Sequence, residues 1–335
     1  MKLEGRKVLV TGADGFIGSH LTELLVRAGA TVTALSQYDS FGHNGWLDDL
    51  SEDIHSSIEI TRGDICDPAF VRKLVAGNHV VFHLAALIAI PYSYVAPHSY
   101  VNVNVNGTLN VLEACRNSDV ERMIHTSTSE VYGTAQFTPI SEQHPLVAQS
   151  PYAASKIAAD MMVTAYARSF DLPAVILRPF NTYGPRQSER AVLPSLIRQA
   201  IDPNCDVIQV GNLSPIRDFN FVTDISRAFT LAGVAEHIEF GTPYNVGSGQ
   251  GVSIGQAANI ICDICGTNKP IENDEARHRP DQSEVYELLA DSTKFQKPAT
   301  WKSEIDLRHG LTETISWWQE QSDGANLRRG KSMMY

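Results

Sequence analysis

No apolar stretch in this chain approaches the ~20 residues that a membrane-spanning helix needs. Positive charge is also scarce, because 27 lysines and arginines stand against 38 aspartates and glutamates, for a net charge of -11. The only basic cluster lies at the extreme C-terminus. This balance argues against a nucleic-acid or membrane partner and favours a small molecule. Because the charged N-terminus runs directly into a short apolar strand, we expect a cytoplasmic protein.

Cysteine is scarce as well. The five cysteines are scattered and odd in number, which is typical of reduced thiols. Cys262 and Cys265 form a C-x-x-C pair, but no second pair completes a metal site. They lie at helical spacing in an apolar run, so we expect buried or half-buried packing thiols and no metal site.

The length of 335 residues and a hydrophobic fraction of 43% predict one large or two closely joined domains. Short apolar runs that read as strands alternate with helical patterns up to about residue 180. The expected strands are 7–11, 31–35, 57–61, 79–86, 122–126 and 174–178, and the expected helices follow Phe16, cover 68–75 and 104–117, and follow Tyr152. This order predicts an α/β fold, a Rossmann-type doubly wound parallel sheet with ligands at the carboxyl ends of its strands. Two long connections, Gln37–Leu47 and Thr134–Ser150, should cover a site.

A glycine turn follows the first expected strand. Gly12 permits a tight turn, Gly15 lets backbone N–H groups approach a pyrophosphate at the helix N-terminus, and Gly18 allows close packing of helix and strand. The spacing is G-x-x-G-x-x-G, which differs from the G-x-G-x-x-G of the standard dinucleotide fingerprint. The same glycines could also serve only to pack the first strand and helix.

The second expected strand bears on the choice of cofactor. An acidic residue at its end would hold the ribose 2′-hydroxyl of NAD, but Ser36 stands there and Asp39 lies three residues further on. No arginine lies between Ala30 and Ile58 to bind the 2′-phosphate of NADP. We therefore expect NAD, with NADP less favoured.

Tyr152 and Lys156 are four residues apart in a segment of helical composition. Both side chains should leave the same helix face, so the ammonium can lie near the phenol. A nearby cation lowers the pKa of a phenol, which would make a base of the tyrosine. Tyr-x-x-x-Lys by itself is a weak signal, and a surface lysine beside a packed tyrosine is the plain alternative.

Taken together, these motifs resemble one family. They are Thr11–Gly18, His83–Ala86, Asn104–Thr108, Thr128–Glu130, Tyr152 with Lys156, Arg178–Arg186 and Arg217–Asp218. In this order and at these intervals they are similar to the extended short-chain dehydrogenase/reductase family of NAD(P)-dependent nucleotide-sugar epimerases and dehydratases. Ser36–Phe41 and Arg279–Val285 further resemble the N-acetylhexosamine 4,6-dehydratases of legionaminic acid pathways.

The resemblance implies a division of the chain. Residues 1–180 would form an NAD-binding Rossmann domain to which segments near 218–246 return. Residues 181–325 would form a smaller α+β domain that binds a nucleotide sugar. The cofactor would be bound by Gly12, Asp14, Gly15, Phe16, Ile17, Gly18, Ser36, Asp64, Ile65, Leu84, Ala85, Ala86, Asn104, Tyr152 and Lys156. The substrate would be bound by Asn181, Arg186, Leu193, Arg217 and Arg279.

The same resemblance assigns chemistry to Thr128, Ser129, Glu130, Tyr152 and Lys156. Tyr152 would deprotonate the sugar 4-hydroxyl while hydride passes to NAD, and Glu130 would remove the C5 proton before water leaves from C6. The glucose 4,6-dehydratases carry an aspartate where this chain has Ser129, so Glu130 would have to deliver the proton to the departing hydroxyl.

Other functions stay open at this point. A 4-epimerase needs Tyr152 and Lys156 but has no use for Glu130. Thr128–Glu130 is also similar to the UDP-glucuronate decarboxylases, which surround their tyrosine differently. An NAD-sensing binding protein is the alternative outside the enzymes.

Apolar stripes over Asn104–Arg116 and Tyr152–Tyr166 exceed what one sheet face needs. In the family the equivalent helices pair across a dimer. We therefore expect a homodimer with a helical interface.

Overall fold

The computed structural model describes residues 2–277 and 284–323. Its centre is a parallel sheet of seven strands in the order β11-β6-β5-β4-β1-β2-β3. The strands are β1 (Lys7–Thr11), β2 (Thr31–Gln37), β3 (Ile58–Gly63), β4 (Val80–His83), β5 (Arg122–Thr126), β6 (Ala174–Pro179) and β11 (Pro243–Val246). Strands β2 and β3 are added on one side of β1, and β4 and the later strands on the other side. The boundary between β1 and β4 is the topological switch point where such sheets bind ligands. The predicted doubly wound α/β fold is confirmed.

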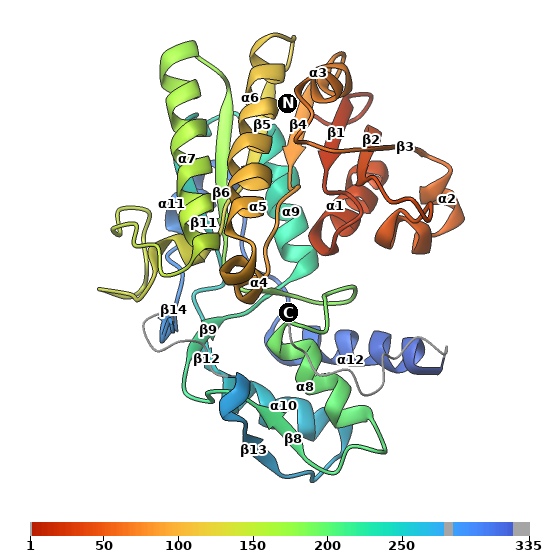
Figure 1. Cartoon of the computed structure of the whole chain (residues 1–335), viewed down its shortest axis with the longest axis vertical. Helices are drawn as coiled ribbons and strands as arrows, with labels where there is room; N and C mark the ends of the chain where they lie inside the picture. Colours follow the sequence, from red (N-terminus) through yellow and green to blue (C-terminus); the bar gives the residue numbers. More distant parts are fainter. Residues whose placement is uncertain (1, 278–283, 324–335) are drawn as a thin grey trace.

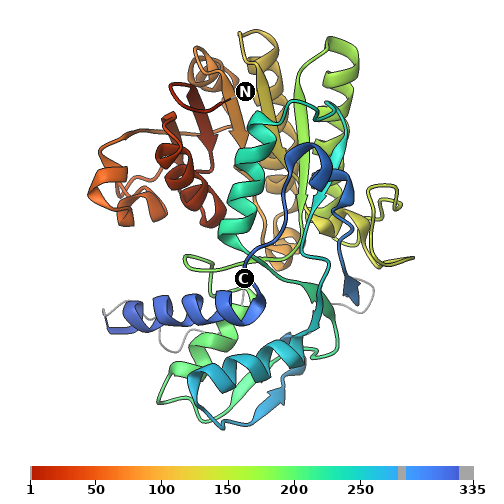
Figure 2. The same cartoon turned by 180° about the vertical axis from the view of Figure 1, so that it is seen from behind.

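Apolar side chains on both faces of the strands explain this architecture. In β1, Val8 and Val10 enter one core cluster while Leu9 enters the other, as the period of two requires. Three helices cover the face seen in Figure 1, namely α3 (Pro68–Val75), α6 (Gly107–Arg116) and α7 (Pro151–Phe170). The opposite face, seen in Figure 2, carries α1 (Phe16–Arg27), α9 (Val222–Val234) and α11 (Thr293–Ala299).

Short helices fill the connections. They are α2 (Glu52–His55), α4 (Ile90–Val95), α5 (Pro97–Tyr100), the π-helix η2 (Val101–Asn106) and the 3₁₀ helices η1 (Gly45–Asp49), η3 (Ser129–Tyr132) and η4 (Glu275–Arg277). The helix expected over 104–117 thus starts in a π-helical turn, and its α-helical part begins only at Gly107. Such turns are rare and often mark functional sites.

A smaller α+β region lies below the large sheet in Figure 1. Its helices are α8 (Val192–Ile201), α10 (Ile254–Cys265) and α12 (Leu307–Asp323). Its strands pair as β7 (Thr182–Tyr183) with β10 (Asn220–Phe221), β8 (Ile208–Val210) with β13 (Ile271–Asn273), and β9 (Ile216–Asp218) with β12 (Gly251–Ser253) and β14 (Glu287–Leu288). The thiols of Cys262 and Cys265 are half-buried against the apolar core of this region.

Both long connections contact C-terminal parts of the chain. Trp46, from the first one, meets Trp317 of α12 edge to face, with ring centroids 5.5 Å apart. Ile140, from the second, exchanges backbone hydrogen bonds with Leu289 and Asp291. Among the helices of the described residues, none has the length and apolar character that crossing a bilayer requires.

Candidate active site

The glycine turn after β1 has a backbone that larger residues could not adopt. Gly12 has φ +68°, and a Cβ there would lie 2.8 Å from the Ala85 nitrogen. A Cβ on Gly18 would lie 2.0 Å from the Gly12 carbonyl oxygen. Gly15 is the N-cap of α1 and, among the described residues, no side chain caps this helix. The first N–H groups of α1 are therefore available to an anion at the positive end of the helix.

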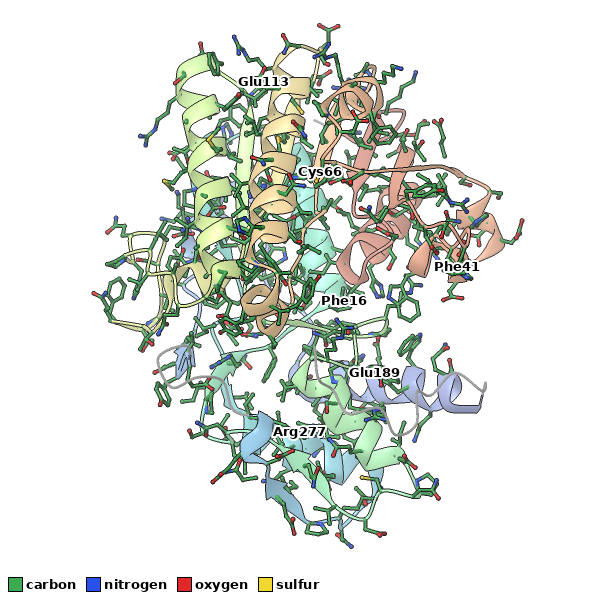
Figure 3. All side chains as sticks on the ribbon, viewed as in Figure 1. Phe16, Phe41, Cys66, Glu113, Glu189 and Arg277 are labelled. Atoms are coloured by element: carbon green, nitrogen blue, oxygen red, sulfur yellow. The ribbon has the colours of Figure 1, made fainter. Side chains whose placement is uncertain are left out.

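The predicted residues on either side of this turn come from the start of α1 and from the segment after β4. Phe16, at the start of α1, lies on the side facing the smaller region (Figure 3), and Ile17 packs against the core. Leu84, Ala85 and Ala86 follow β4 and are half-buried. The backbone nitrogens of Leu84 and Ala85 donate to Thr11 Oγ1 at 3.2 Å each, which fixes this backbone beside the glycine turn.

The end of β2 contains the predicted ribose site. Ser36 is buried, and Asp14 Oδ2 accepts a hydrogen bond from the Gln37 nitrogen at 3.1 Å. Burial raises the pKa of Asp14, while the hydrogen bonds from the Gln37 nitrogen and the Ser36 hydroxyl oppose the rise. Arg62 of β3 pairs with Ser36 across the sheet, and its Nε donates to Asn44 Oδ1 at 2.7 Å. Arg62 lies beyond the interval from Ala30 to Ile58, and the pairing of β2 with β3 brings it to the site.

At the edge of the sheet next to β2, Asp64 and Ile65 follow β3. Asp64 is exposed and its Oδ1 accepts from the Cys66 nitrogen at 2.8 Å. Ile65 is buried, and it packs so closely on Gly107 that a Cβ there would lie 2.6 Å from its Cδ1. The apolar side chain of Ile65 and the exposed carboxylate of Asp64 are suited to a position beside an adenine.

Asn104 lies in the π-helical turn and is 1% exposed. Its amide nitrogen donates to the Leu87 carbonyl and to Ser155 Oγ, at 2.9 Å each, and its Oδ1 accepts from the Leu87 nitrogen at 2.8 Å. The Ser155 hydroxyl in turn donates to the Tyr152 carbonyl at 2.7 Å. The Asn104 amide therefore ties the segment after β4 to the helix that carries Tyr152 and Lys156.

Thr128, Ser129 and Glu130 form a tight turn at the carboxyl end of β5. Thr128 is the N-cap of η3, and its Oγ1 accepts from the Glu130 nitrogen at 3.2 Å. Thr128 and Ser129 are buried and Glu130 is half-buried. The turn brings the threonine hydroxyl to Tyr152, with which it forms a hydrogen bond, and the Glu130 charge acts on the same phenol.

Tyr152 and Lys156 are both buried in the first turns of α7. Burial raises the pKa of the Tyr152 phenol, and the charge of Glu130 adds to the rise, whereas the hydrogen bond with Thr128 opposes it. Lys156 Nζ donates to the Thr126 carbonyl at 2.6 Å, and burial lowers its pKa to about 8. The expectation that the pKa of Tyr152 falls toward working pH is therefore not met by these residues alone, because desolvation dominates.

The predicted substrate residues come from the smaller region and its edge. Asn181 Oδ1 is buried without a hydrogen-bond partner among the described residues. Arg186, with φ +68°, donates to Glu23 Oε1 of α1 at 3.1 Å. Arg217 is buried and lies 3.6 Å from Glu284. Leu193 is buried in the apolar core. The fifth predicted residue, Arg279, lies outside the described residues.

Sequence reasoning missed a buried ion pair beneath the site. Asp160, one helical turn beyond Lys156, accepts hydrogen bonds from the Arg178 guanidinium at 2.9 and 3.0 Å and from Ser127 Oγ at 2.8 Å. The sequence does carry a signal for it, because a charged residue four positions after Lys156 on an apolar helix needs a partner.

The residues present fit a dinucleotide cofactor. The glycines leave a cradle at the uncapped start of α1 that a Cβ would obstruct, and a buried serine and an exposed carboxylate stand at the ends of β2 and β3. The paired tyrosine and lysine follow at the end of β5. Fold and site together define a class, the dinucleotide-dependent enzymes of the extended short-chain dehydrogenase/reductase type.

A family model described as GDP-mannose 4,6 dehydratase matches residues 9–314, and the chain belongs to this family. A dTDP-glucose 4,6-dehydratase from Actinoplanes sp. is 32% identical over 319 residues, which are 93% of this chain and 98% of that protein. The resemblance to the extended short-chain dehydrogenase/reductase family of nucleotide-sugar epimerases and dehydratases is thereby confirmed.

The solved structures that are similar to this chain include 4-epimerases. The UDP-N-acetylglucosamine 4-epimerase from Methanobrevibacter ruminantium has a TM-score of 0.85 at 30% identity, with 95% of this chain and 99% of that one covered. The UDP-glucuronic acid 4-epimerase from Bacillus cereus, solved with UDP-glucuronic acid and NAD, has a TM-score of 0.84 at 27% identity, covering 94% and 99%. The chain is thus a nucleotide-sugar dehydratase or epimerase of the NAD(H)-dependent kind.

Proposed function

We propose that this chain is an NAD-dependent nucleotide-sugar 4,6-dehydratase that converts a UDP- or GDP-linked N-acetylglucosamine-type sugar into a 4-keto-6-deoxy sugar. The observation that carries the proposal is the position of Glu130. Its carboxylate is half-buried in the same turn as Thr128 and acts electrostatically on the Tyr152 phenol. A carboxylate there is a suitable base for a C5 proton, and a simple epimerase has no use for it.

The residues would divide the work as follows. Bound NAD supplies a hydride acceptor for C4 and a hydride donor for C6. Tyr152 accepts the 4-hydroxyl proton, with Thr128 hydrogen-bonded to the same oxygen. Because burial raises the pKa of Tyr152, forming the phenolate needs a positive charge close by, and Lys156 is the cation that α7 places one turn away.

Oxidation at C4 makes the C5 hydrogen acidic. Glu130 takes this proton, and the same carboxyl group delivers it to the departing C6 hydroxyl, because the Ser129 hydroxyl is no acid near neutrality. One carboxyl group would thus serve as base and then as acid within one turnover. The product is completed when hydride returns to C6 and a proton from solvent adds to C5, while Tyr152 releases to solvent the proton it took from the 4-hydroxyl.

On the substrate side, Asn181 Oδ1 is a buried acceptor that has no hydrogen-bond partner within the described part of the chain, and Arg186 and Arg217 offer positive charge. We propose that Arg186 and Arg217, together with Arg279, bind the nucleotide diphosphate. Guanidinium groups suit this role because they bind phosphate oxygens in pairs.

A 4-epimerase is the second candidate, since solved structures similar to this chain include 4-epimerases. Mass spectrometry of products from a panel of UDP-, GDP- and dTDP-sugars separates the two. A product that has lost one water supports the dehydratase. An isomer of unchanged mass supports the epimerase.

A further inference from the structure

A network of buried polar side chains joins the elements that carry the catalytic residues. Its centre is Asp160, a fully buried residue of α7 whose Oδ2 accepts from Ser127 Oγ and from two nitrogens of Arg178. Ser127 directly precedes Thr128, and Arg178 belongs to β6. The network thus spans β5, β6 and α7, neighbouring elements in Figure 1.

Arg178 extends the network to the turn of Ser129 and Glu130. Its Nη1 donates to Tyr132 Oη of η3 at 2.9 Å. The Tyr132 hydroxyl donates to Asn245 Oδ1 of β11 at 2.6 Å, and the Asn245 amide donates to the Ile140 carbonyl at 2.8 Å. One chain of hydrogen bonds therefore runs from the catalytic helix to the catalytic turn and to the loop that follows it.

The network also sets the charge around Lys156. The groups that interact with its ammonium are the Asp160 carboxylate and the imidazoles of His83 and His125. The Arg178 guanidinium acts on the same Asp160 carboxylate. Burial lowers the pKa of His125 to about 4, so this imidazole is neutral at working pH. Burial acts to raise the pKa of Asp160, but His125 and the two cations outweigh it and hold the pKa below its usual value. Asp160 is thus the anion that offsets both buried cations.

Stability alone does not account for such a pair. A buried ion pair loses so much hydration that apolar residues of similar volume often stabilise a fold equally well. We propose that Asp160 is a positioning residue for hydride transfer: through Ser127 and Arg178 it holds the Thr128–Glu130 turn against α7, and it stands one helical turn after Lys156 on the same helix. This inference rests on the proposed redox chemistry at C4, and it applies equally to a dehydratase and an epimerase.

The first test compares Asp160→Asn with Asp224→Asn. Asp224 is a suitable control, because it is also a buried, ion-paired carboxylate but lies on α9. It pairs with Arg227 and accepts hydrogen bonds from the Ser303 hydroxyl and from the backbone nitrogens of residues 304 and 305. For the sugar that the product panel identifies, Asp160→Asn should lower kcat by ~10–100-fold with little change in KM, since small misplacements of reacting groups cost about that much. Asp224→Asn should leave both constants near the parent values.

The pH profile gives a readout that a purely structural role would not move. Without the Asp160 charge, Lys156 loses its proton at lower pH, so the alkaline limb of the rate profile should shift to lower pH in Asp160→Asn and stay in place in Asp224→Asn. If Asp160→Asn matches the control in both rate and profile, the positioning role is refuted.

A second measurement needs no substrate. In protein labelled with ¹³C at the lysine Cε, with Lys156→Met used for assignment, the Lys156 titration should move down by about one pH unit or more in Asp160→Asn. An unchanged titration contradicts the inference. If the parent enzyme oxidises no nucleotide sugar, the proposed function fails, and this titration still decides whether Asp160 controls the lysine.

Asp160→Asn leaves Arg178 buried without its counter-charge and could unfold the protein. The double variant Asp160→Asn with Arg178→Met removes both charges, so no buried guanidinium is left unpaired. If it folds, the double variant should show the same loss of kcat as Asp160→Asn. A folded double variant with the parent rate overturns the proposal.

Discussion

At the scale of single residues, burial more than the neighbouring lysine sets the chemistry of Tyr152. The spacing of Tyr152 and Lys156 correctly indicates one helix. It does not indicate that Lys156 donates to the Thr126 carbonyl or that the tyrosine is desolvated. Tyr152 packs against Ile90 and Tyr100, which come from a different part of the chain. Sequence spacing predicts which side chains share a helix face, and tertiary packing decides their protonation.

Arg62 shows that sequence spacing is equally limited in predicting the choice of cofactor. Its pairing with Ser36 across β2 and β3 places a guanidinium beside the predicted ribose site. We still expect NAD to be recovered when the purified protein is denatured, because Arg62 is engaged by Asn44 and by the Gly42 carbonyl. Arg62→Ala should therefore keep its NAD and lose whatever affinity for NADP the parent has, measured by calorimetry with each dinucleotide.

Arg72→Ala, which changes an exposed arginine on α3, is the matched control and should alter neither affinity. Recovery of mainly NADP from the parent protein would reject the NAD preference. It would leave the fold and the catalytic residues as described.

At the scale of elements, the local patterns identified most of the large sheet. Strand, glycine turn and helix appear where hydrophobic periodicity and the glycines place them. The short helices α4 and α5 were not predicted, because residues 90–100 show no clear period and contain two prolines. The π-helical turn was also missed, since it depends on the bonds of Asn104 to Leu87 and Ser155.

The helices α6 and α7 carry the prediction about assembly. They pack side by side on one face of the sheet, and Met161 and Phe170 of α7 remain 48% and 45% exposed. We propose a homodimer in which these helices pair with those of a second copy. Light scattering at micromolar concentration should give the dimer mass, and Met161→Glu should shift it toward the monomer by placing a charge in the interface.

Phe41→Glu serves as the control, because Phe41 is 85% exposed but lies away from α6 and α7 in Figure 3. It should leave the dimer intact. A monomeric mass for the parent protein would overturn the proposed assembly.

At the scale of the whole molecule, the chain leaves the large sheet after β6 and comes back to it with α9 and β11. This return brings Asn245 into the network below the active site. The predicted anion-binding arginines are held by residues distant in sequence, Arg186 by Glu23 and Arg217 by Glu284. The motifs single out these arginines but could not identify their ion-pair partners, because such contacts depend on tertiary packing.

Glu130 tests the central claim most directly. Glu130→Gln keeps the shape of the side chain and removes its basicity, so oxidation at C4 should continue while removal of the C5 proton fails. Incubated with NAD and substrate, the variant should accumulate the absorbance of reduced cofactor and exchange little solvent deuterium into C5. Formation of the 4-keto-6-deoxy product should fall by ~10²–10⁴-fold, the usual cost of a lost general base. Tyr152→Phe should differ, because without the phenol no reduced cofactor builds up.

The decisive quantity is the rate of 4-keto-6-deoxy product formation by Glu130→Gln, measured beside the reduced-cofactor signal. The account predicts a slow product and a high cofactor signal. Turnover by Glu130→Gln at close to the parent rate would contradict the dehydratase assignment and favour an epimerase built on Tyr152 and Lys156.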